Sequence, residues 1–118
     1  MSESNQQKKW EREEVIILVG EYFRNKTLSV EQIDESYYKV SNFLRKREEI
    51  LTGMSVEEIF RNYAGIRMQT ARVRCLDPET KLSGMEGTKL QKEIVAEYLQ
   101  NPKNILMEME RIYKKYGE

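Results

Sequence analysis

SVEEIFRNYAGIRMQTARVRCLDP, residues 55–78, is the stretch around which the chain is organised. Four arginines lie between Ile59 and Leu76 with no acidic residue among them, so residues 59–76 carry a charge of +4. The whole chain of 118 residues contains 20 Lys or Arg and 20 Asp or Glu, so the remaining residues together carry −4. This local excess of positive charge is the main asymmetry in an otherwise neutral sequence.

The same stretch predicts helix. Ser55 and Glu58 have the spacing of a capping box, which predicts a helix start at Ser55. An inward stripe is predicted from apolar and small residues three or four positions apart, namely Ile59, Tyr63, Ile66, Thr70 and Val73. Gly65 weakens a continuous helix, which favours a break near residues 62–65 and two shorter helices. Pro78 ends the element, because the residue before a proline avoids helical geometry.

Outward from this stretch, apolar periodicity predicts four more helices, over residues 11–24, 30–51, 89–99 and from Pro102 onward. Their start signals are Ser29, Thr88 and Asn101, and Gly53 is a typical C-terminal stop. Residues 79–87 are predicted to form a loop. We therefore expect an all-α fold, a compact bundle of five or six helices with a single core. Residues 1–9 are expected to be a disordered tail and residues 10–118 one helical domain.

Several function classes are disfavoured by composition. The chain has no histidine and one cysteine, Cys75, which removes the commonest general base and zinc sites of the Cys/His type. It has no Gly-rich phosphate loop and no GxSxG motif. We therefore expect no enzyme activity, no catalytic residue, no metal and no cofactor. A single cysteine, no long apolar run and no signal-peptide core predict a cytoplasmic protein without a membrane partner.

The arginine-rich stretch has two interpretations. In the functional one, the guanidinium groups contact nucleic-acid phosphates; the candidates are Arg61, Arg67, Arg72 and Arg74. Candidate groove contacts are Asn62, Gln69 and Thr70, and the outer basic candidates are Lys81 and Lys89. In the structural interpretation, these arginines pair with glutamates and hold the bundle together. The zero net charge does not favour nucleic acid, and the charge run Arg45 to Arg47 is interpreted as a solvated face.

Six short motifs follow one another along residues 10–112. They are Trp10 with Arg12-Glu13-Glu14, Glu21-Tyr22-Phe23, Phe60-Arg61-Asn62, Gly65-Ile66 with Met68, Leu76-Asp77-Pro78, and Gly84. This order resembles the helical N-terminal domain that precedes HNH nuclease domains in McrA-type, modification-dependent restriction endonucleases. The chain departs from that pattern at Tyr63-Ala64 and at residues 72–75. The resemblance implies a module of a restriction or defence system. It does not imply cleavage, because HNH chemistry needs histidine and this sequence has none.

Two functions are therefore expected. The first is a non-catalytic DNA-binding or DNA-positioning module that helps place a nuclease on double-stranded DNA. The alternative is a protein-interaction module, for example a regulator or inhibitor that docks on a nuclease through a helix face, which the methionines Met54, Met68 and Met85 would suit. The two differ in salt response, because DNA binding weakens steeply with salt and a largely apolar protein interface does not.

Overall fold

The computed structural model describes residues 8–117 of the chain. The predicted disordered tail, residues 1–9, lies outside the described residues except for Lys8 and Lys9. Those two residues are held in place: the Lys8 ammonium pairs with Glu48, and the Lys9 carbonyl accepts a hydrogen bond from Arg61 at 3.2 Å. The expectation of a disordered tail over residues 1–9 stays a prediction.

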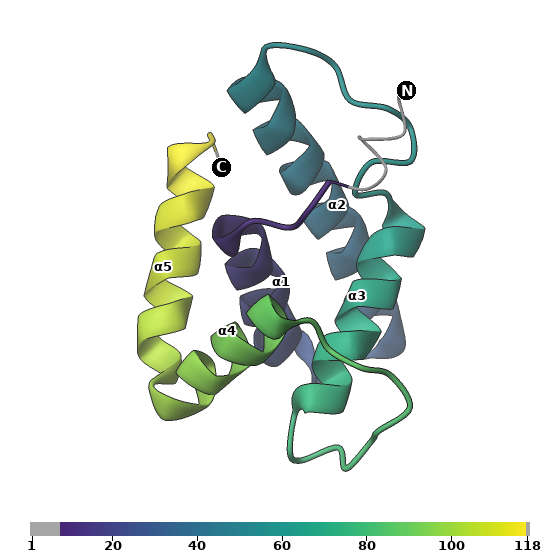
Figure 1. Ribbon diagram of the computed structural model, residues 1–118, viewed down its shortest axis with the longest axis vertical. Coiled ribbons are helices and arrows are strands. Elements are labelled where there is room, and N and C mark those ends of the chain that lie inside the picture. Colours follow the sequence, from purple (N-terminus) through teal and green to yellow (C-terminus); the bar gives the residue numbers. More distant parts are fainter. Residues whose placement is uncertain (1–7, 118) are drawn as a thin grey trace.

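Five helices make up the fold, and the described residues contain no strand. They are α1 (Arg12–Asn25), α2 (Val30–Thr52), α3 (Tyr63–Leu76), α4 (Lys89–Gln100) and α5 (Pro102–Lys115) (Figure 1). The predicted all-α bundle with one core is confirmed. No helix formed by residues 8–117 is long and apolar enough to cross a membrane.

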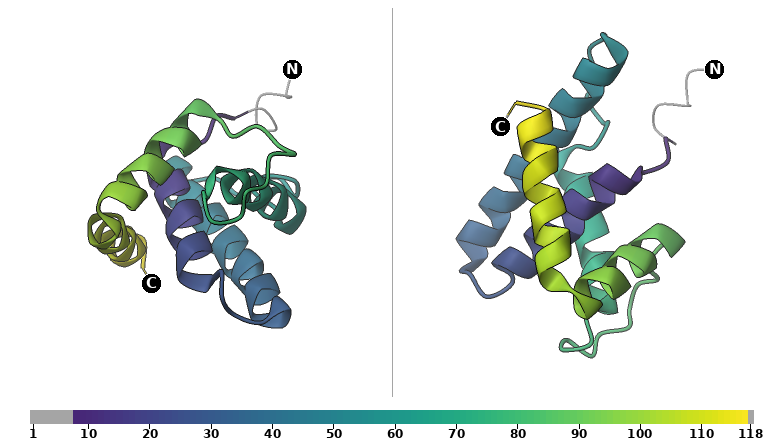
Figure 2. Two further views of the ribbon diagram at one scale, coloured as in Figure 1. Left: turned by 90° about the horizontal axis from the view of Figure 1, so that it is seen from below. Right: turned by 90° about the vertical axis from the view of Figure 1, so that its left-hand side faces the viewer.

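The first helix lies at the centre of the bundle. α1 contacts each of the other four helices, which surround it in the two views of Figure 2. The sequence predicted one inward stripe on this helix, but every residue from Glu14 to Tyr22 is buried, as expected for a helix packed on all sides. Gly20 permits part of this packing, because a Cβ built there would lie 2.6 Å from the Met109 sulfur on α5.

Apolar side chains from the outer helices complete the core. The buried members outside α1 include Val40, Phe43, Leu44, Ile66, Val73, Ile94, Val95, Ile105, Met109, Ile112 and Tyr113. The Phe43 and Tyr113 rings meet edge to face, 4.6 Å between centroids, and join α2 to α5. Each outer helix therefore presents one apolar face to α1 or its neighbours, which is the pattern the periodicity predicted.

The start and stop signals are confirmed for most helices. The Ser29, Thr88 and Asn101 side chains each accept a hydrogen bond from the backbone N–H three residues on. Gly53 follows α2 in the left-handed conformation, with φ of 73°. These signals act locally, so the sequence shows them directly.

The helix predicted to start at Ser55 is absent. α3 instead begins at Tyr63, where the Asn62 side chain accepts a hydrogen bond from the Gly65 N–H at 2.9 Å. Arg45 donates to the carbonyls of residues 57, 58 and 60, and the Glu57 carbonyl also accepts the Phe60 N–H at 3.0 Å, so a hydrogen-bonded turn tied to α2 stands where the helix was predicted. Arg61 is left-handed, with φ of 45°, so the chain turns there. The predicted break near residues 62–65 is confirmed, and Ile59 is exposed instead of lying in the inward stripe.

Candidate functional site

The four candidate arginines do not form one surface, and Arg61 is the clearest correction. It is 8% exposed, and its guanidinium donates to both carboxylate oxygens of Glu14 at 2.7 and 3.1 Å. Glu14 is 1% exposed, and the guanidinium also stacks over the Trp10 and Phe60 rings. A buried, fully engaged guanidinium is not accessible to a DNA phosphate, so the predicted phosphate contact is wrong for Arg61.

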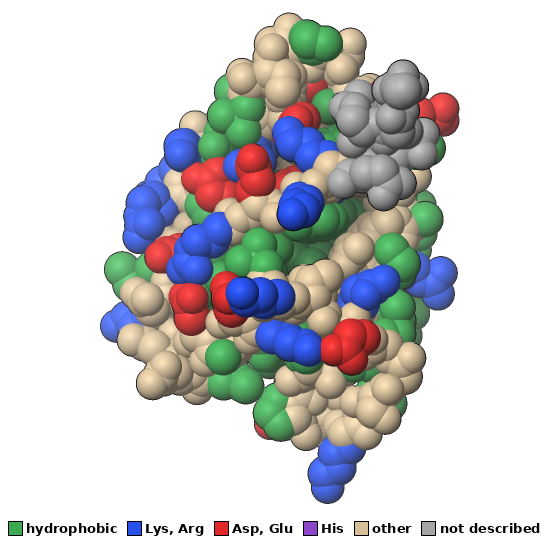
Figure 3. All heavy atoms as spheres, viewed as in Figure 1, with side chains coloured by type: hydrophobic (Ala, Val, Ile, Leu, Met, Phe, Trp, Pro, Cys, Tyr) green, Lys and Arg blue, Asp and Glu red, His purple; other side chains and the backbone are tan. Residues whose placement is uncertain are grey.

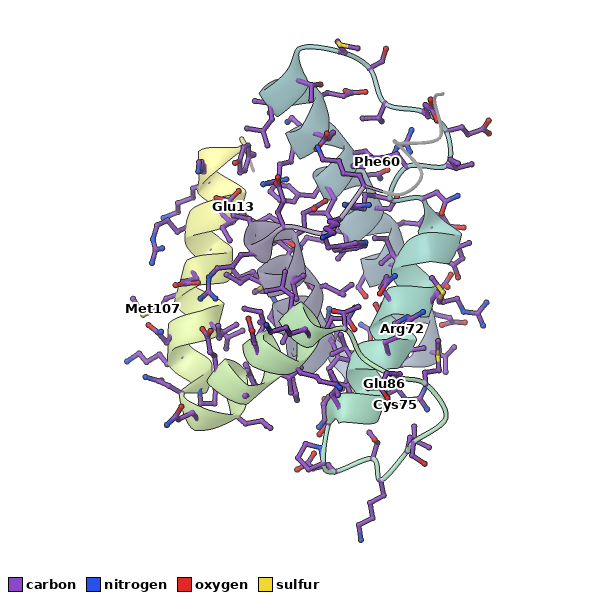
Figure 4. All side chains as sticks on the ribbon, in the orientation of Figure 1. Glu13, Phe60, Arg72, Cys75, Glu86 and Met107 are labelled. Atoms are coloured by element: carbon purple, nitrogen blue, oxygen red, sulfur yellow. The ribbon has the colours of Figure 1, made fainter. Side chains whose placement is uncertain are left out.

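A second buried arginine, Arg47 of α2, lies against the N-terminal end of α1. Arg47 pairs with Glu11 at 2.6 Å and with Glu13 at 3.0 Å. Glu13 also accepts hydrogen bonds from Lys115 and Tyr116, and Figure 4 shows it beside α5. Burial acts to raise the pKa of Glu13, but these donors outweigh it and lower the pKa. Arg47 therefore lies in a structural charge cluster, which corrects the solvated-face interpretation for this residue, whereas Lys46 is exposed.

Arg72 lies on another side of α3. Its guanidinium donates to the Glu86 carbonyl at 2.7 Å, and Figure 4 shows the two residues side by side next to the loop that follows α3. Gln69 accepts a hydrogen bond from Gln91, which joins α3 to α4. Both residues therefore serve contacts within the fold, and neither lines a cleft with Arg67 and Arg74.

Arg67 and Arg74 differ from the other members of the stretch. Both are exposed, and within residues 8–117 neither side chain makes a hydrogen bond or an ion pair. They are seven residues apart on α3, which places them on the same face of the helix. That face lines a cleft of about 580 Å³ between α1, α2, α3 and the turn after α3.

The cleft combines positive charge with apolar surface. Its α2 wall carries Val30, Ile33, Tyr37 and Val40. Val30 is 84% exposed, so part of this apolar wall is open to solvent. The cleft therefore places two unpaired guanidinium groups opposite an apolar strip.

The other charged groups of the cleft have partners. Lys26 pairs with Asp77 and with Glu79, at 2.6 Å in each case. Glu21 accepts hydrogen bonds from Tyr113, Arg24 and Asn25. Burial acts to raise the pKa of Glu21, but these donors and nearby cations lower it, so the carboxylate is ionised and satisfied. The remaining acid, Asp34, accepts a hydrogen bond from the Tyr63 hydroxyl. Arg67 and Arg74 are thus the basic residues of the cleft that have no ion pair within residues 8–117, and Asp34 is the cleft acid whose partner is a neutral hydroxyl.

The remaining candidates are dispersed. Thr70 is buried and lines the cleft between the two arginines, whereas Asn62 caps α3. Lys81 is exposed in the loop after α3, and Lys89 is the first residue of α4. Neither lysine lines the cleft. The structure therefore brings together only Arg67, Thr70 and Arg74 from the predicted set.

The wider surface has no dominant sign on the side shown in Figure 3, where acidic and basic side chains alternate. Among residues 8–117 no group of three or more His, Cys, Asp or Glu side chains is arranged to hold a metal. The sequence did not indicate Lys26, Val30 and Tyr37 as cleft residues, because Lys26 comes from the turn after α1 and the other two from α2. The one available signal was the seven-residue spacing of Arg67 and Arg74.

Comparison of the chain with models of protein families, with curated proteins and with solved structures finds no match. The functional argument therefore depends on the cleft itself. Its chemistry is that of a site for an anionic ligand with an apolar part.

Proposed function

We propose that this chain is a non-catalytic protein-interaction module that binds an acidic, partly apolar segment of a partner in the cleft between α1, α2 and α3. The observation that carries the proposal is the pair of unpaired arginines, Arg67 and Arg74, beside an open apolar wall. Every other charged residue of the cleft already has a partner within the fold. A ligand carboxylate would therefore meet two guanidinium groups that have no ion-pair partner within residues 8–117.

The spacing of the arginines indicates what the segment must carry. Seven residues of helix rise about 10 Å, so a ligand that engages both arginines needs two acidic groups at about that separation. Arginine binds carboxylates with two parallel hydrogen bonds, and such charge-assisted bonds are stronger than neutral ones. The apolar wall of Val30 and Tyr37 adds binding through burial of ligand side chains.

Selection from a random peptide library displayed on phage tests the proposal. We expect peptides selected on the immobilised chain to contain Asp or Glu residues alternating with apolar ones. Binding of these peptides should be lost with the double variant Arg67→Glu, Arg74→Glu. The matched control is Arg111→Glu, which reverses the charge of an exposed arginine on α5, outside the cleft. Peptides without acidic residues, equal binding to the double variant, or no enrichment would contradict the proposal.

A second candidate is the DNA-positioning role that the resemblance to McrA-type N-terminal domains implies. The observation in its favour is the same pair of free guanidinium groups, which suit phosphates as well as carboxylates. With Arg61 buried and Arg72 engaged elsewhere, two phosphate contacts are expected in place of four. Binding to a labelled duplex, followed by anisotropy, should then fall with salt at a logarithmic slope of about −1.8.

The two candidate functions predict different results in the binding experiments. Duplex binding with that slope, lost in the double variant and retained in Arg111→Glu, supports the DNA-positioning role. Peptide binding that is lost in the double variant and retained in Arg111→Glu, without duplex binding, supports the protein-interaction role.

A further inference from the structure

The end of the molecule formed by the C-terminus of α2 exposes apolar side chains. Here "the tip" means residues 49–59, the last turn of α2 and the segment that follows it. Ile50, Leu51, Met54 and Ile59 are 53%, 53%, 68% and 49% exposed. Figure 1 shows this end of α2 projecting at the top of the molecule. Several large apolar side chains exposed within one short segment indicate an interaction site.

The tip is also acidic. Residues 48–60 contain Glu48, Glu49, Glu57 and Glu58 and no lysine or arginine. Glu48 is buried and paired with Lys8, whereas Glu49 and Glu58 are exposed. One Glu49 carboxylate oxygen accepts the Val56 N–H at 3.4 Å, and Arg45 of α2 donates to the backbone carbonyls of residues 57 and 58. The tip therefore has carboxylates beside apolar side chains, which is the chemistry of the segment that we propose the cleft binds.

The tip and the cleft lie at opposite ends of α2. The cleft wall is formed by the first half of this helix, from Val30 to Val40, and the tip begins at Glu49. A helix of 23 residues is about 35 Å long. The tip is therefore held away from the cleft of its own molecule by a rigid helix, and it can enter only the cleft of another molecule.

We propose that the occupant of the cleft is the tip of a second copy of this chain, so that molecules associate head to tail. This proposal rests on the proposed function of the cleft. It pairs Arg67 and Arg74 of one copy with Glu49 and Glu58 of the next, and Val30 and Tyr37 with the exposed apolar residues of the tip. A head-to-tail dimer still has one free tip, on one copy, and one free cleft, on the other, so association continues beyond a dimer.

Sedimentation velocity of the whole chain over a wide range of protein concentration tests the proposal. We expect the sedimentation coefficient to rise with concentration past that of a dimer. The cleft variant Arg67→Glu, Arg74→Glu and the tip variant Glu49→Lys, Glu58→Lys should each weaken association more than tenfold, because like charges then face each other. The matched controls Arg111→Glu and Glu93→Lys, both at exposed positions outside the two surfaces, should associate as the unmodified chain does.

Mixing the two charge-reversed variants provides the decisive measurement. Every junction in an alternating array then has opposite charges, so association should return in the mixture although each variant alone has lost it. A variant that had merely misfolded would not be rescued in this way. No rescue in the mixture, or equal association of all the variants, would overturn the head-to-tail arrangement.

Failure of this proposal is distinguishable from failure of the proposed function. If the unmodified chain sediments as a monomer at all concentrations while selected acidic peptides still bind the cleft, self-association is wrong and the peptide-binding function stands. If neither occurs, both are wrong.

Discussion

Arginine side chains are buried and ion-paired near one end of α1 and exposed and unpaired near the other. At the N-terminal end, Arg47 and Arg61 are buried and bound by Glu11, Glu13 and Glu14. Near the C-terminal end, Arg67 and Arg74 of α3 face a cleft whose acids are already satisfied. Residues of the same type, a few positions apart in one stretch, therefore have a structural role at one end and are free for a ligand at the other.

The difference has an energetic basis. A buried pair is desolvated, and the loss of one partner leaves the other charged in a low-dielectric interior. An exposed guanidinium keeps most of its hydration and contributes little to folding, so it is available for binding. Substitutions at the N-terminal end of α1 should therefore lower stability, and substitutions of the cleft arginines should lower ligand binding. The following experiments test this difference.

The largest expected effect is that of Arg61→Ala. Removing this guanidinium leaves Glu14, 1% exposed, without its ion-pair partner. The free energy of unfolding should fall by about 3–5 kcal/mol, measured by urea denaturation. The matched control Arg67→Ala should change it by no more than about 0.5 kcal/mol. An equal loss of unfolding free energy for Arg61→Ala and Arg67→Ala would contradict the difference between the buried arginines and the cleft arginines.

A smaller loss is expected from Asp77→Asn, beside the cleft. Asp77 is 2% exposed and accepts hydrogen bonds from the Tyr22 hydroxyl at 2.7 Å and from Lys26 at 2.6 Å. The substitution should cost about 1–3 kcal/mol in urea denaturation. Because it also weakens the pairing of Lys26, acidic peptides selected on the cleft should bind more tightly. Weaker peptide binding at unchanged stability would contradict this view of Lys26.

Acid should destabilise the fold through the same carboxylates. Burial acts to raise the pKa of Glu21 and Asp77, but their donors outweigh it, so both pKa values lie below the ordinary 4.5 and 3.8. Their stabilisation is complete above those ordinary values and is lost as pH falls through the lowered ones. The urea midpoint should therefore decrease from about pH 5 to about pH 2. Glu21→Gln should flatten part of that slope, and an unchanged slope would exclude Glu21 as a contributor.

The smallest effect on stability is expected from the double substitution Arg67→Ala, Arg74→Ala. Neither side chain has a hydrogen bond or ion pair within residues 8–117, so the free energy of unfolding should change by about 0.5 kcal/mol or less. Binding of selected acidic peptides should be abolished in the same protein. A large loss of stability would show that these arginines hold the fold together.

Local signals in the sequence predicted most of the fold. Ser29, Thr88 and Asn101 cap helices because their side chains reach the backbone three residues on, a contact that needs no tertiary structure. Ser55 carried the same kind of signal, yet no helix starts there. Arg45, from α2, donates to carbonyls of the turn that stands in its place, and the sequence does not show that contact.

The candidate site was predicted in part. Arg67, Thr70 and Arg74 do share one face of α3, because their spacing matches the helical repeat. Arg61 and Arg72 were grouped with them by charge. Arg61, however, precedes α3, and Arg72 lies on another side of that helix. Charge along the chain does not indicate which guanidinium will meet a buried carboxylate.

The sequence by itself determined the helices, most of their ends and the excess of positive charge in residues 59–76, because these depend on neighbours within about one turn of chain. Only the tertiary structure decided that α1 is the central helix and which charges remain free. That depends on residues far apart in sequence, such as Glu14 and Arg61, meeting in the interior. Burial makes such a pairing obligatory, and the arginines left at the surface are the ones available to a ligand.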